Sequence, residues 1–328
     1  MKIFITGGGG YVGSRLVPQL LDLGYEVVVY DTFYYGNFLP FDNKNLKIVK
    51  GDLRDVTLLE ASIPKGATVL HMACISNDAS FALEPKLSTT INYESLTGLI
   101  AACRKKEIKR FIFASTSSVY GVSDAKEITE THPLRPITQY NEYKALSEPI
   151  ILQEKDNFEV TIFRPATVCG YSPRMRFDLS VNILTGHAIS KNKITVFGGE
   201  QLRPNLHILD YINLVKLLIN SDKCLNEVYN VGNQNLSLME IAQLVKDTLI
   251  SIDSNYSRLE IFRTPSDDIR SYHINSEKIK NDLDFTPKFS IQKAVSEIYE
   301  AFITRRVAHD IDDPIYHNVK LLKLMGIK

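Results

Sequence analysis

The sequence predicts an α/β fold, in which a doubly wound parallel sheet is followed by a smaller C-terminal α/β domain. Over residues 1–170, short apolar segments rich in β-branched residues alternate with amphipathic segments of helical spacing. This alternation is typical of a parallel sheet with helices on both faces. Beyond residue 170 the alternation fails and insertions appear. A length of 328 residues also exceeds most single cores, which favours a second domain or an appendage.

The first 31 residues predict a strand, a glycine-rich turn, a helix and a second strand. Three glycines in the turn have the spacing G-x-x-G-x-x-G: Gly7, Gly10 and Gly13. Side chains there would keep the diphosphate of a dinucleotide away from the N–H groups of the helix N-terminus. Asp31 ends the second strand, where a carboxylate accepts hydrogen bonds from ribose hydroxyls and repels a 2′-phosphate. We therefore predict binding of NAD rather than NADP. A glycine-rich turn without a ligand is the alternative, and the surrounding strand, helix and acid disfavour it.

Three further strands are expected over residues 45–49, 67–71 and 109–115, with a long helix over residues 84–106. Asp52 follows the first of these strands, where it either contacts an adenine amino group or caps the helix that begins near Val56. Asn92, inside the long helix, either bridges backbone carbonyls to the next strand or has a catalytic role. Both pairs of alternatives stay open at this point.

The composition excludes several classes of protein. A formal net charge of zero gives no electrostatic argument for nucleic acid or an anionic membrane as partner. No apolar run approaches the ~20 residues of a membrane-spanning helix. Met1 leads directly into the first strand, which leaves no room for a signal peptide, so we expect a cytoplasmic protein. Four scattered cysteines form no C-x-x-C pair and are expected to be reduced and buried: Cys74, Cys103, Cys169 and Cys224.

Polar residues with a clear chemical use follow the fifth strand and lie on the next helix. Thr116 comes directly after that strand, at the edge of the sheet where ligands bind. Thr138 is a candidate N-cap for a helix on which Tyr140 and Lys144, four residues apart, share one face. An adjacent ammonium favours the phenolate of a tyrosine, whose pKa is ordinarily near 10. The phenol then accepts a proton from a substrate hydroxyl while hydride leaves the same carbon, and Thr116 holds the substrate oxygen.

The chain resembles the extended short-chain dehydrogenase/reductase family, specifically its NAD-dependent nucleotide-sugar epimerases and dehydratases. The resemblance covers nearly the whole chain, and its motifs are T-G-G-G-G-Y-V-G at 6–13, Asp31, G-D-L at 51–53, H-M-A at 71–73, S-T-S-S-V-Y-G at 115–121, Tyr140-x-x-x-Lys144 and R-P-A-T-V-C-G at 164–170. Cys169 stands where tyrosine is usual in the last motif. The resemblance implies a Rossmann-type sheet, Tyr140 as the base, Lys144 as the residue that tunes it and binds the nicotinamide ribose, and Thr116 at the catalytic Ser/Thr position.

The resemblance also implies two sets of binding residues. The expected NAD contacts are Gly7, Gly10, Tyr11, Val12, Asp31, Asp52, Leu53, Met72, Ala73, Tyr140, Lys144 and Pro165. The expected nucleotide-sugar contacts are Ser80, Thr116, Thr167, Arg174, Arg176, Leu179, Arg203 and Arg270. Residues 1–170 would form the NAD-binding domain, which segments near 205–232 rejoin, and residues 171–204 and 233–328 would form the nucleotide-sugar domain. A homodimer would pack the helices over residues 84–106 and 138–155 into a four-helix bundle.

The second half carries further expectations of its own. Arg174 and Arg176 suit a diphosphate, and the alternative is a pair of solvated charges. Asp210 is expected to be the N-cap of a helix over residues 211–220, and residues 227–231 to form a strand that rejoins the main sheet. Helices are expected over residues 180–190, 238–250 and 291–304. We interpret the remaining segment, which includes His309 and His317, as a solvated polar tail rather than a metal site, because its spacings match no ligand pattern.

The candidate reaction follows from what replaces the family's acid pair. Dehydratases of this family carry an acid pair directly after the catalytic threonine, where this chain has Ser117 and Ser118. Asp31 disfavours the NADPH that most reductases consume. A C4-epimerase that retains its NAD is therefore the prediction, with a one-way C4 dehydrogenase or reductase as the main alternative and a 4,6-dehydratase behind it. A non-catalytic NAD-binding protein is the alternative from another class, and the presence of both Tyr140 and Lys144 argues against it.

Overall fold

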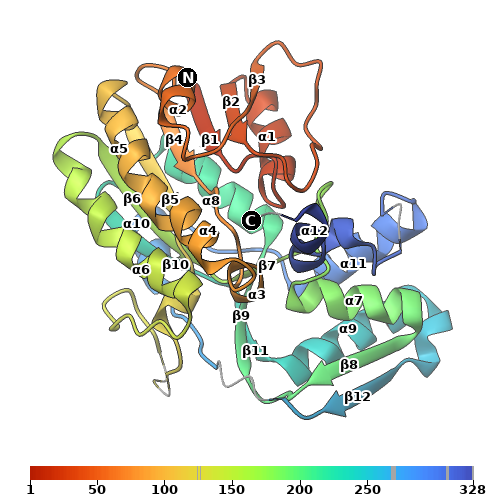
Figure 1. The fold of residues 1–328 in the computed structure, drawn as a ribbon. Coiled ribbons are helices and arrows are strands. Elements are labelled where there is room, and N and C mark those ends of the chain that lie inside the picture. Colours follow the sequence, from red (N-terminus) through yellow and green to blue (C-terminus); the bar gives the residue numbers. More distant parts are fainter. Residues whose placement is uncertain (124, 126, 267–270, 308–309, 327–328) are drawn as a thin grey trace.

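A seven-stranded parallel sheet forms the centre of the molecule (Figure 1). The computed structural model describes residues 1–123, 125, 127–266, 271–307 and 310–326. The strand order is β10-β6-β5-β4-β1-β2-β3, and all six pairings are parallel. The strands are β1 (Lys2–Thr6), β2 (Glu26–Asp31), β3 (Leu46–Lys50), β4 (Thr68–His71), β5 (Arg110–Ala114), β6 (Glu159–Pro165) and β10 (Glu227–Val231). The predicted doubly wound sheet is confirmed, and so is the return of residues 227–231 to it. The strand order switches between β1 and β4: β2 and β3 lie on one side of this point, and β4, β5 and β6 lie on the other. Such sheets bind ligands at this switch point.

Helices cover both faces of this sheet. One face carries α1 (Gly13–Asp22) and α8 (Ile208–Asn220), and the other carries α2 (Val56–Ser62), α5 (Ser95–Lys105) and α6 (Gln139–Leu152). Alternate residues of β1 serve the two faces, because successive side chains of a strand point in opposite directions. Ile3 and Ile5 belong to the core under α1 and α8, whereas Phe4 belongs to the core under α2 and α5.

A smaller C-terminal region has a core of its own beside the sheet (Figure 1). Its helices are α7 (Ser180–Lys191), α9 (Leu238–Ile252) and α11 (Ile291–Ile303), and its parallel strand pair is β8 (Lys193–Phe197) with β12 (Glu260–Thr264). A three-stranded sheet lies between the two parts, built from β7 (Thr167–Cys169), β9 (Leu202–His207) and β11 (Gln234–Ser237). The shorter helices are α3 (Asp78–Phe81), α4 (Pro85–Thr89), α10 (Glu277–Leu283) and α12 (Asn318–Met325).

The predicted long helix contains a π-helical turn. It consists of α4, the π turn Thr90–Glu94 and α5, and Asn92 lies in the π turn. The side chain of Asn92 accepts a hydrogen bond from the backbone N–H of Ile75 (2.7 Å) and donates to the carbonyl of the same residue (3.0 Å). Of the two interpretations of Asn92, the structure therefore shows a backbone bridge, although to this loop residue and not to the next strand. The asparagine fixes the loop that follows β4.

Two predictions for the second half are wrong. Asp210 is not the N-cap of α8, because the helix begins earlier and the Nδ1 atom of His207 accepts the capping hydrogen bond from the Leu209 N–H (3.1 Å). Asp210 instead accepts hydrogen bonds from the N–H groups of Lys288 and Phe289, at 2.9 Å each. The C-terminal segment is not a solvated tail either. It forms α12, and Leu322 packs in a small apolar cluster with Ile75 and Ile91.

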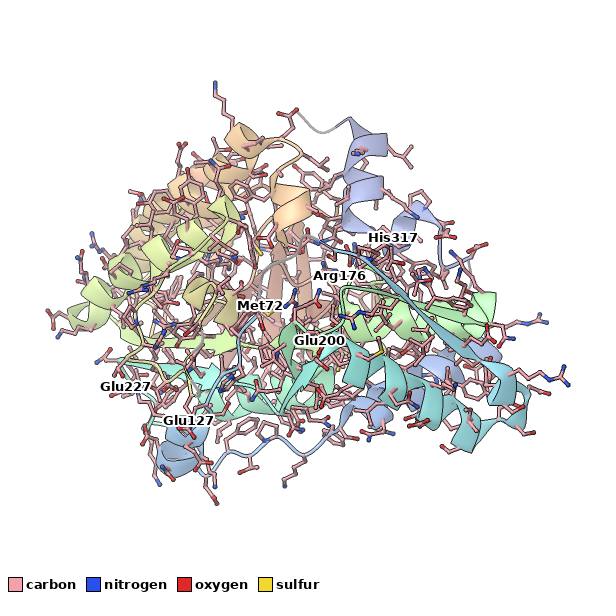
Figure 2. The ribbon with its side chains drawn as sticks, turned by 90° about the horizontal axis from the view of Figure 1, so that it is seen from below. Met72, Glu127, Arg176, Glu200, Glu227 and His317 are labelled. Atoms are coloured by element: carbon pink, nitrogen blue, oxygen red, sulfur yellow. The ribbon has the colours of Figure 1, made fainter. Side chains whose placement is uncertain are left out.

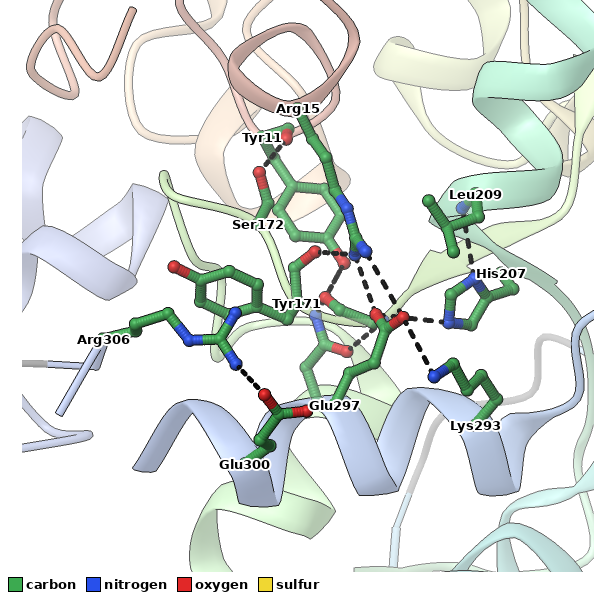
Figure 3. Close-up of polar contacts among 12 residues, drawn as sticks. Tyr11, Arg15, Tyr171, Ser172, His207, Leu209, Lys293, Glu297, Glu300 and Arg306 are labelled. Atoms are coloured by element: carbon green, nitrogen blue, oxygen red, sulfur yellow. Dashed lines mark hydrogen bonds and ion pairs between the residues drawn. The ribbon is translucent and has the colours of Figure 1, made fainter. Parts of the chain in front are cut away.

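A polar network joins α1 to the C-terminal region (Figure 3). Arg15 of α1 pairs with Glu297 of α11 at 2.8 Å, and the Nε2 atom of His207 lies 3.6 Å from the same carboxylate. Burial lowers the pKa of His207 to about 4, against the attraction of Glu297, so this histidine is neutral at neutral pH. Nearby, the Tyr11 hydroxyl donates to the Gly170 carbonyl at 2.5 Å. The network fixes the glycine-rich turn relative to the C-terminal region.

The described residues offer neither a membrane-spanning helix nor a metal site. None of the helices in the described part of the chain is long and apolar enough to cross a membrane. Among the same residues, no group of three or more His, Cys, Asp or Glu side chains is placed to hold a metal ion. His309, which the sequence analysis considered in this context, lies outside the described residues.

Candidate active site

A cleft of about 400 Å³ lies at the carboxyl ends of the central strands, beside the C-terminal region. It brings together eighteen of the predicted residues: Gly7, Gly10, Tyr11, Val12, Asp31, Asp52, Leu53, Met72, Ala73, Thr116, Tyr140, Lys144, Pro165, Thr167, Arg174, Arg176, Leu179 and Arg203. Ser80 is not among them, because its side chain is buried on α3 and lines a separate, smaller pocket next to α4 and α12. Arg270 lies outside the described residues.

The glycine-rich turn has no room for side chains. Gly7 has φ +77°, and a Cβ atom on it would lie 2.6 Å from the backbone nitrogen of Ala73. A Cβ atom on Gly13 would lie 2.3 Å from the carbonyl oxygen of Gly8. The first glycine thus permits the close approach of β4, and the second permits α1 to begin directly on the turn. Both roles are those expected of a dinucleotide-binding turn.

Asp31 lines the cleft and also shapes the turn. Its Oδ2 atom accepts a hydrogen bond from the Gly9 N–H (2.9 Å), and its Oδ1 atom accepts one from the Phe33 N–H (2.7 Å). Burial raises the pKa of Asp31, whereas these two N–H groups and the nearby charge of Arg174 act in the opposite direction. Each carboxylate oxygen keeps a second lone pair for a ribose hydroxyl.

Asp52 does not cap α2. The cap is Asp55, which accepts from the Leu58 N–H at 3.0 Å. Asp52 pairs with Arg54 at 2.7 Å and lines the cleft, so of its two interpretations the adenine contact is the one that stays a prediction.

Tyr140 and Lys144 lie together in the cleft on α6, and Thr138 caps this helix as predicted, accepting from the Asn141 N–H. The ammonium of Lys144 donates to the Ala114 carbonyl at 2.7 Å and lies 4.6 Å from the centre of the Phe113 ring. The ammonium is thus held at the end of β5 beside the cleft, and the role of Lys144 in lowering the phenol pKa stays a prediction. Burial raises the pKa of Tyr140, the neighbouring Cys74 and Asp78 raise it further, and the cation that lowers it is Arg176.

Thr116 belongs to a chain of polar groups that the sequence analysis did not find. Its Oγ1 atom lies 2.8 Å from the Ser118 Oγ and accepts from the Ser118 N–H at 3.2 Å. The Ser118 hydroxyl in turn donates to the side chain of Asn141, the residue after Tyr140. The chain therefore links Thr116 to the helix that carries Tyr140. Only the position of Asn141 next to Tyr140 could have pointed to it.

The cysteines are all free, as expected, but they are not equally buried. Cys103, Cys169 and Cys224 are buried, whereas Cys74 is half-buried and lines the cleft.

Arg174 and Arg176 are buried at the cleft, not solvated. Their exposed fractions are 2% and 8%, and Figure 2 shows Arg176 and Met72 in the middle of the molecule. Arg176 donates to Asp178 at 2.8 Å. One nitrogen of each guanidinium, Nε of Arg174 and Nη2 of Arg176, is buried without a hydrogen-bond partner among the described residues. Because a buried cation needs compensation, this arrangement fits an anionic group in the cleft.

These observations together fit a dinucleotide. The turn excludes side chains, Asp31 offers lone pairs at the end of β2, and the two arginines offer unpartnered donors to a diphosphate. Other cleft residues were not predicted, among them Asn318, Tyr35, Asp78, Tyr211 and Tyr272.

Comparisons with known proteins agree with this description. The model of the NAD dependent epimerase/dehydratase family matches residues 3–232. An uncharacterized UDP-glucose epimerase of Bacillus subtilis, YtcB, is 29% identical over 259 residues, which are 75% of this chain and 82% of that protein. UDP-glucuronic acid decarboxylase 1 of Arabidopsis thaliana is 26% identical over 323 residues, 94% of this chain and 72% of that protein.

The fold is shared with solved structures as well. The crystal structure of the UDP-glucose 4-epimerase of Thermus thermophilus in complex with NAD superposes with a TM-score of 0.79 at 23% identity and covers 92% of this chain and 99% of that one. The family match extends from β1 through the glycine turn, Thr116, Tyr140 and Lys144 to β10. The chain therefore belongs to the NAD dependent epimerase/dehydratase family, and its cofactor is NAD.

Proposed function

We propose that this protein is a nucleotide-sugar epimerase that inverts C4 of the sugar through a transient 4-keto form. The observation that carries the proposal is one cleft that contains Tyr140, Lys144 and Thr116 next to the glycine-rich turn, without an acid pair after the threonine. Ser117 lies 3.5 Å from the Tyr272 hydroxyl, and the Ser118 hydroxyl donates to Asn141. Serine hydroxyls do not move the extra protons that elimination of water requires. The absence of the acid pair thus argues against a 4,6-dehydratase, and Asp31 argues against an NADPH-dependent reductase.

The residues of the cleft have separate roles in this proposal. When bound, NAD would supply the reversible hydride acceptor for C4 of the sugar. Tyr140 accepts the proton of the C4 hydroxyl and returns it to the same oxygen. Thr116 holds that oxygen, and Lys144 binds the nicotinamide ribose. The glycine-rich turn, Asp31, Asp52, Leu53, Met72, Ala73 and Pro165 would hold the rest of the cofactor.

The substrate and the assembly are part of the proposal. The names of the relatives support UDP-sugars as the first substrates to test. We assign most of the NAD contacts to residues 1–170 with the returning segment 205–232, and the nucleotide sugar to residues 171–204 and 233–328, including Arg203 but without Arg174, Arg176 and Asn318. A homodimer through α4, α5 and α6 is supported by the resemblance and by Leu146 of α6, whose side chain is 43% exposed.

The test is to expose the purified protein to a panel of UDP-sugars and to follow the reduced-nicotinamide absorbance together with the sugar products by NMR. We expect conversion of a UDP-hexose to its C4 epimer without net formation of NADH. NADH accumulating in proportion to added NAD would instead identify a one-way C4 dehydrogenase. Loss of carbon dioxide from UDP-glucuronic acid, or a 4-keto-6-deoxy product, would identify a decarboxylase or a dehydratase.

Replacing Asp31 by alanine is expected to relax the preference for NAD over NADP. The variant removes the carboxylate that repels a 2′-phosphate and accepts from the ribose, so the ratio of the two dissociation constants should change by about tenfold or more. The ratio is measured by titrating the protein with NADH and, separately, with NADPH. The fluorescence of the bound reduced nicotinamide gives each dissociation constant. Asp55→Ala is the matched control, because Asp55 caps α2 and does not line the cleft. An unchanged ratio in Asp31→Ala would mean that the ribose is recognised elsewhere.

A further inference from the structure

Arg174 lies over the glycine-rich turn. Its backbone N–H donates to the hydroxyl of Ser14, the second residue of α1, at 3.2 Å. Its guanidinium lies 4.2 Å from the centre of the Tyr35 ring, and Tyr35 follows β2. Arg174 and Asp31 also attract one another electrostatically. These neighbours belong to the half of the cleft where a dinucleotide diphosphate meets the N-terminus of α1. Arg203, by contrast, is on β9.

Arg176 forms an ion pair with a carboxylate, whereas Arg174 donates a hydrogen bond to the neutral side chain of Asn318. The carboxylate that Arg176 contacts is Asp178. Burial and then the like charge of Arg176 lower the pKa of Arg174 to about 10, against the opposing effects of Asp178, Tyr35 and Asp31. With one buried nitrogen of each guanidinium unpartnered, the pair is suited to an anion with several acceptor oxygens. A diphosphate has this chemistry.

The C-terminal segment, residues 310–326, holds this pair of arginines. Asn318, at the start of α12, is 1% exposed. Its side chain and its backbone N–H contact Arg174 and the residues next to the two arginines. Its Oδ1 accepts from Arg174 Nη2 at 2.6 Å, its Nδ2 donates to Ser76 at 3.0 Å, and its backbone N–H donates to Asp178 at 3.0 Å. Arg176 donates to the same Ser76 hydroxyl at 3.3 Å. Asn318 therefore contacts Arg174 directly and reaches Arg176 through the Ser76 hydroxyl.

A few contacts anchor the rest of the segment. The Phe177 N–H donates to the Tyr316 carbonyl at 2.9 Å, and Lys191 pairs with Asp312 at 2.7 Å on the surface. The outer face of α12 is exposed, with Leu324 at 71%. Within this segment Asn318 lines the cleft, while Ile311, Tyr316 and Leu322 pack into apolar clusters beside it.

We propose that residues 310–326 form a latch over the cofactor, in which Asn318 aims Arg174 and Arg176 at the diphosphate of NAD and thereby slows its release. NAD is then gripped between the glycine-rich turn on one side and residues 174–178 with the latch on the other. The inference rests on NAD as the cofactor and not on which reaction the protein catalyses. An enzyme that must keep its reduced cofactor between two hydride transfers benefits from such a latch.

The test is the rate at which the full-length protein releases NAD. Protein loaded with NADH is mixed with excess NAD, and the loss of bound-nicotinamide fluorescence gives the dissociation rate of NADH. NADH carries the same diphosphate as NAD, so its release reports on the same contacts. We expect Asn318→Ala to release the cofactor about tenfold faster or more, which is the size of one lost hydrogen bond to a charged group. Arg174→Gln should do the same, and the double variant should be little faster than either single one, because both act on one contact.

Leu324→Ala is the matched control on the same helix, and thermal unfolding with saturating NAD shows whether each variant is folded. Three outcomes overturn the latch. Unchanged NAD release with weaker binding of UDP would assign the two arginines to the nucleotide sugar. Equal acceleration in Leu324→Ala would make α12 a general structural support. A lower melting temperature with unchanged NAD release would make Asn318 a packing residue only.

Discussion

Replacing Tyr140 by phenylalanine is expected to lower kcat by about 10²- to 10⁴-fold, the usual contribution of a general base, while NAD still binds. The variant removes one oxygen atom and leaves the ring, so the cleft keeps its shape. The Lys144 contact with the Ala114 carbonyl does not involve the phenol and should persist. Steady-state rates with the best UDP-sugar, together with an NAD titration of both proteins, measure the two effects separately.

The pH profile provides the control for this prediction. Burial, followed by Cys74 and Asp78, raises the pKa of Tyr140, so the phenol is protonated at neutral pH and the base is the minor form. The rate of sugar oxidation by the unchanged protein should therefore rise with pH, and the phenylalanine variant should lose that rise. Near-normal turnover in the variant, or an identical pH profile, would remove Tyr140 as the base. Tyr143→Phe is the matched control for Tyr140→Phe, because the Tyr143 side chain packs against the rings of Phe81 and Tyr93.

Replacing Glu148 by alanine is expected to lower the free energy of unfolding by about 3–5 kcal/mol, because the change leaves a buried guanidinium without its carboxylate. Glu148 pairs with Arg164 at 2.5 Å, and the two side chains are 3% and 6% exposed. Glu148 also accepts from the Ser115 hydroxyl at the end of β5. Arg164 donates further to the Tyr120 hydroxyl at 2.6 Å. Urea unfolding at saturating NAD measures the change.

Two comparisons make the Glu148 prediction specific. Lys65→Ala breaks an ion pair with Glu107 whose side chains are both largely exposed, and it should cost less than about 1 kcal/mol. A double variant, Glu148→Leu with Arg164→Met, removes both charges and should recover much of the lost stability. If Glu148→Ala costs no more than Lys65→Ala, the buried pair is not important for stability.

The sheet and the meeting of Tyr140 and Lys144 in one cleft were predictable because their signals are local. The apolar runs of β1 to β6 need only neighbours in sequence to be recognised, and the glycine spacing with Asp31 lies within one strand–turn–helix–strand unit. Tyr140 and Lys144 lie four residues apart on one helix. Gly7 and Gly13 also behave as their spacing suggested, since a Cβ atom on either would overlap backbone.

The features that escaped prediction depend on contacts between distant segments. Asn318 lies in a stretch of polar composition, and only the fold brings it to Arg174 and Ser76. Asp210 belongs to a residue type that favours N-caps, yet the ring of His207 caps α8. The Asp210 carboxylate instead accepts hydrogen bonds from the N–H groups of Lys288 and Phe289. The pKa of Tyr140 likewise depends on Arg176 and Asp78, which no sequence spacing connects to it.

The cleft is lined both by Gly7, just after the first strand, and by Asn318, at the start of the last helix. During synthesis the glycine-rich turn leaves the ribosome long before α12 does, and at about 5–20 residues per second the interval is on the order of tens of seconds. A nascent chain can form much of the parallel sheet in that time, but its cofactor site has an open wall until translation reaches the final helix. We therefore expect a nascent chain to hold NAD more weakly before α12 has been made than after Asn318 has reached Arg174.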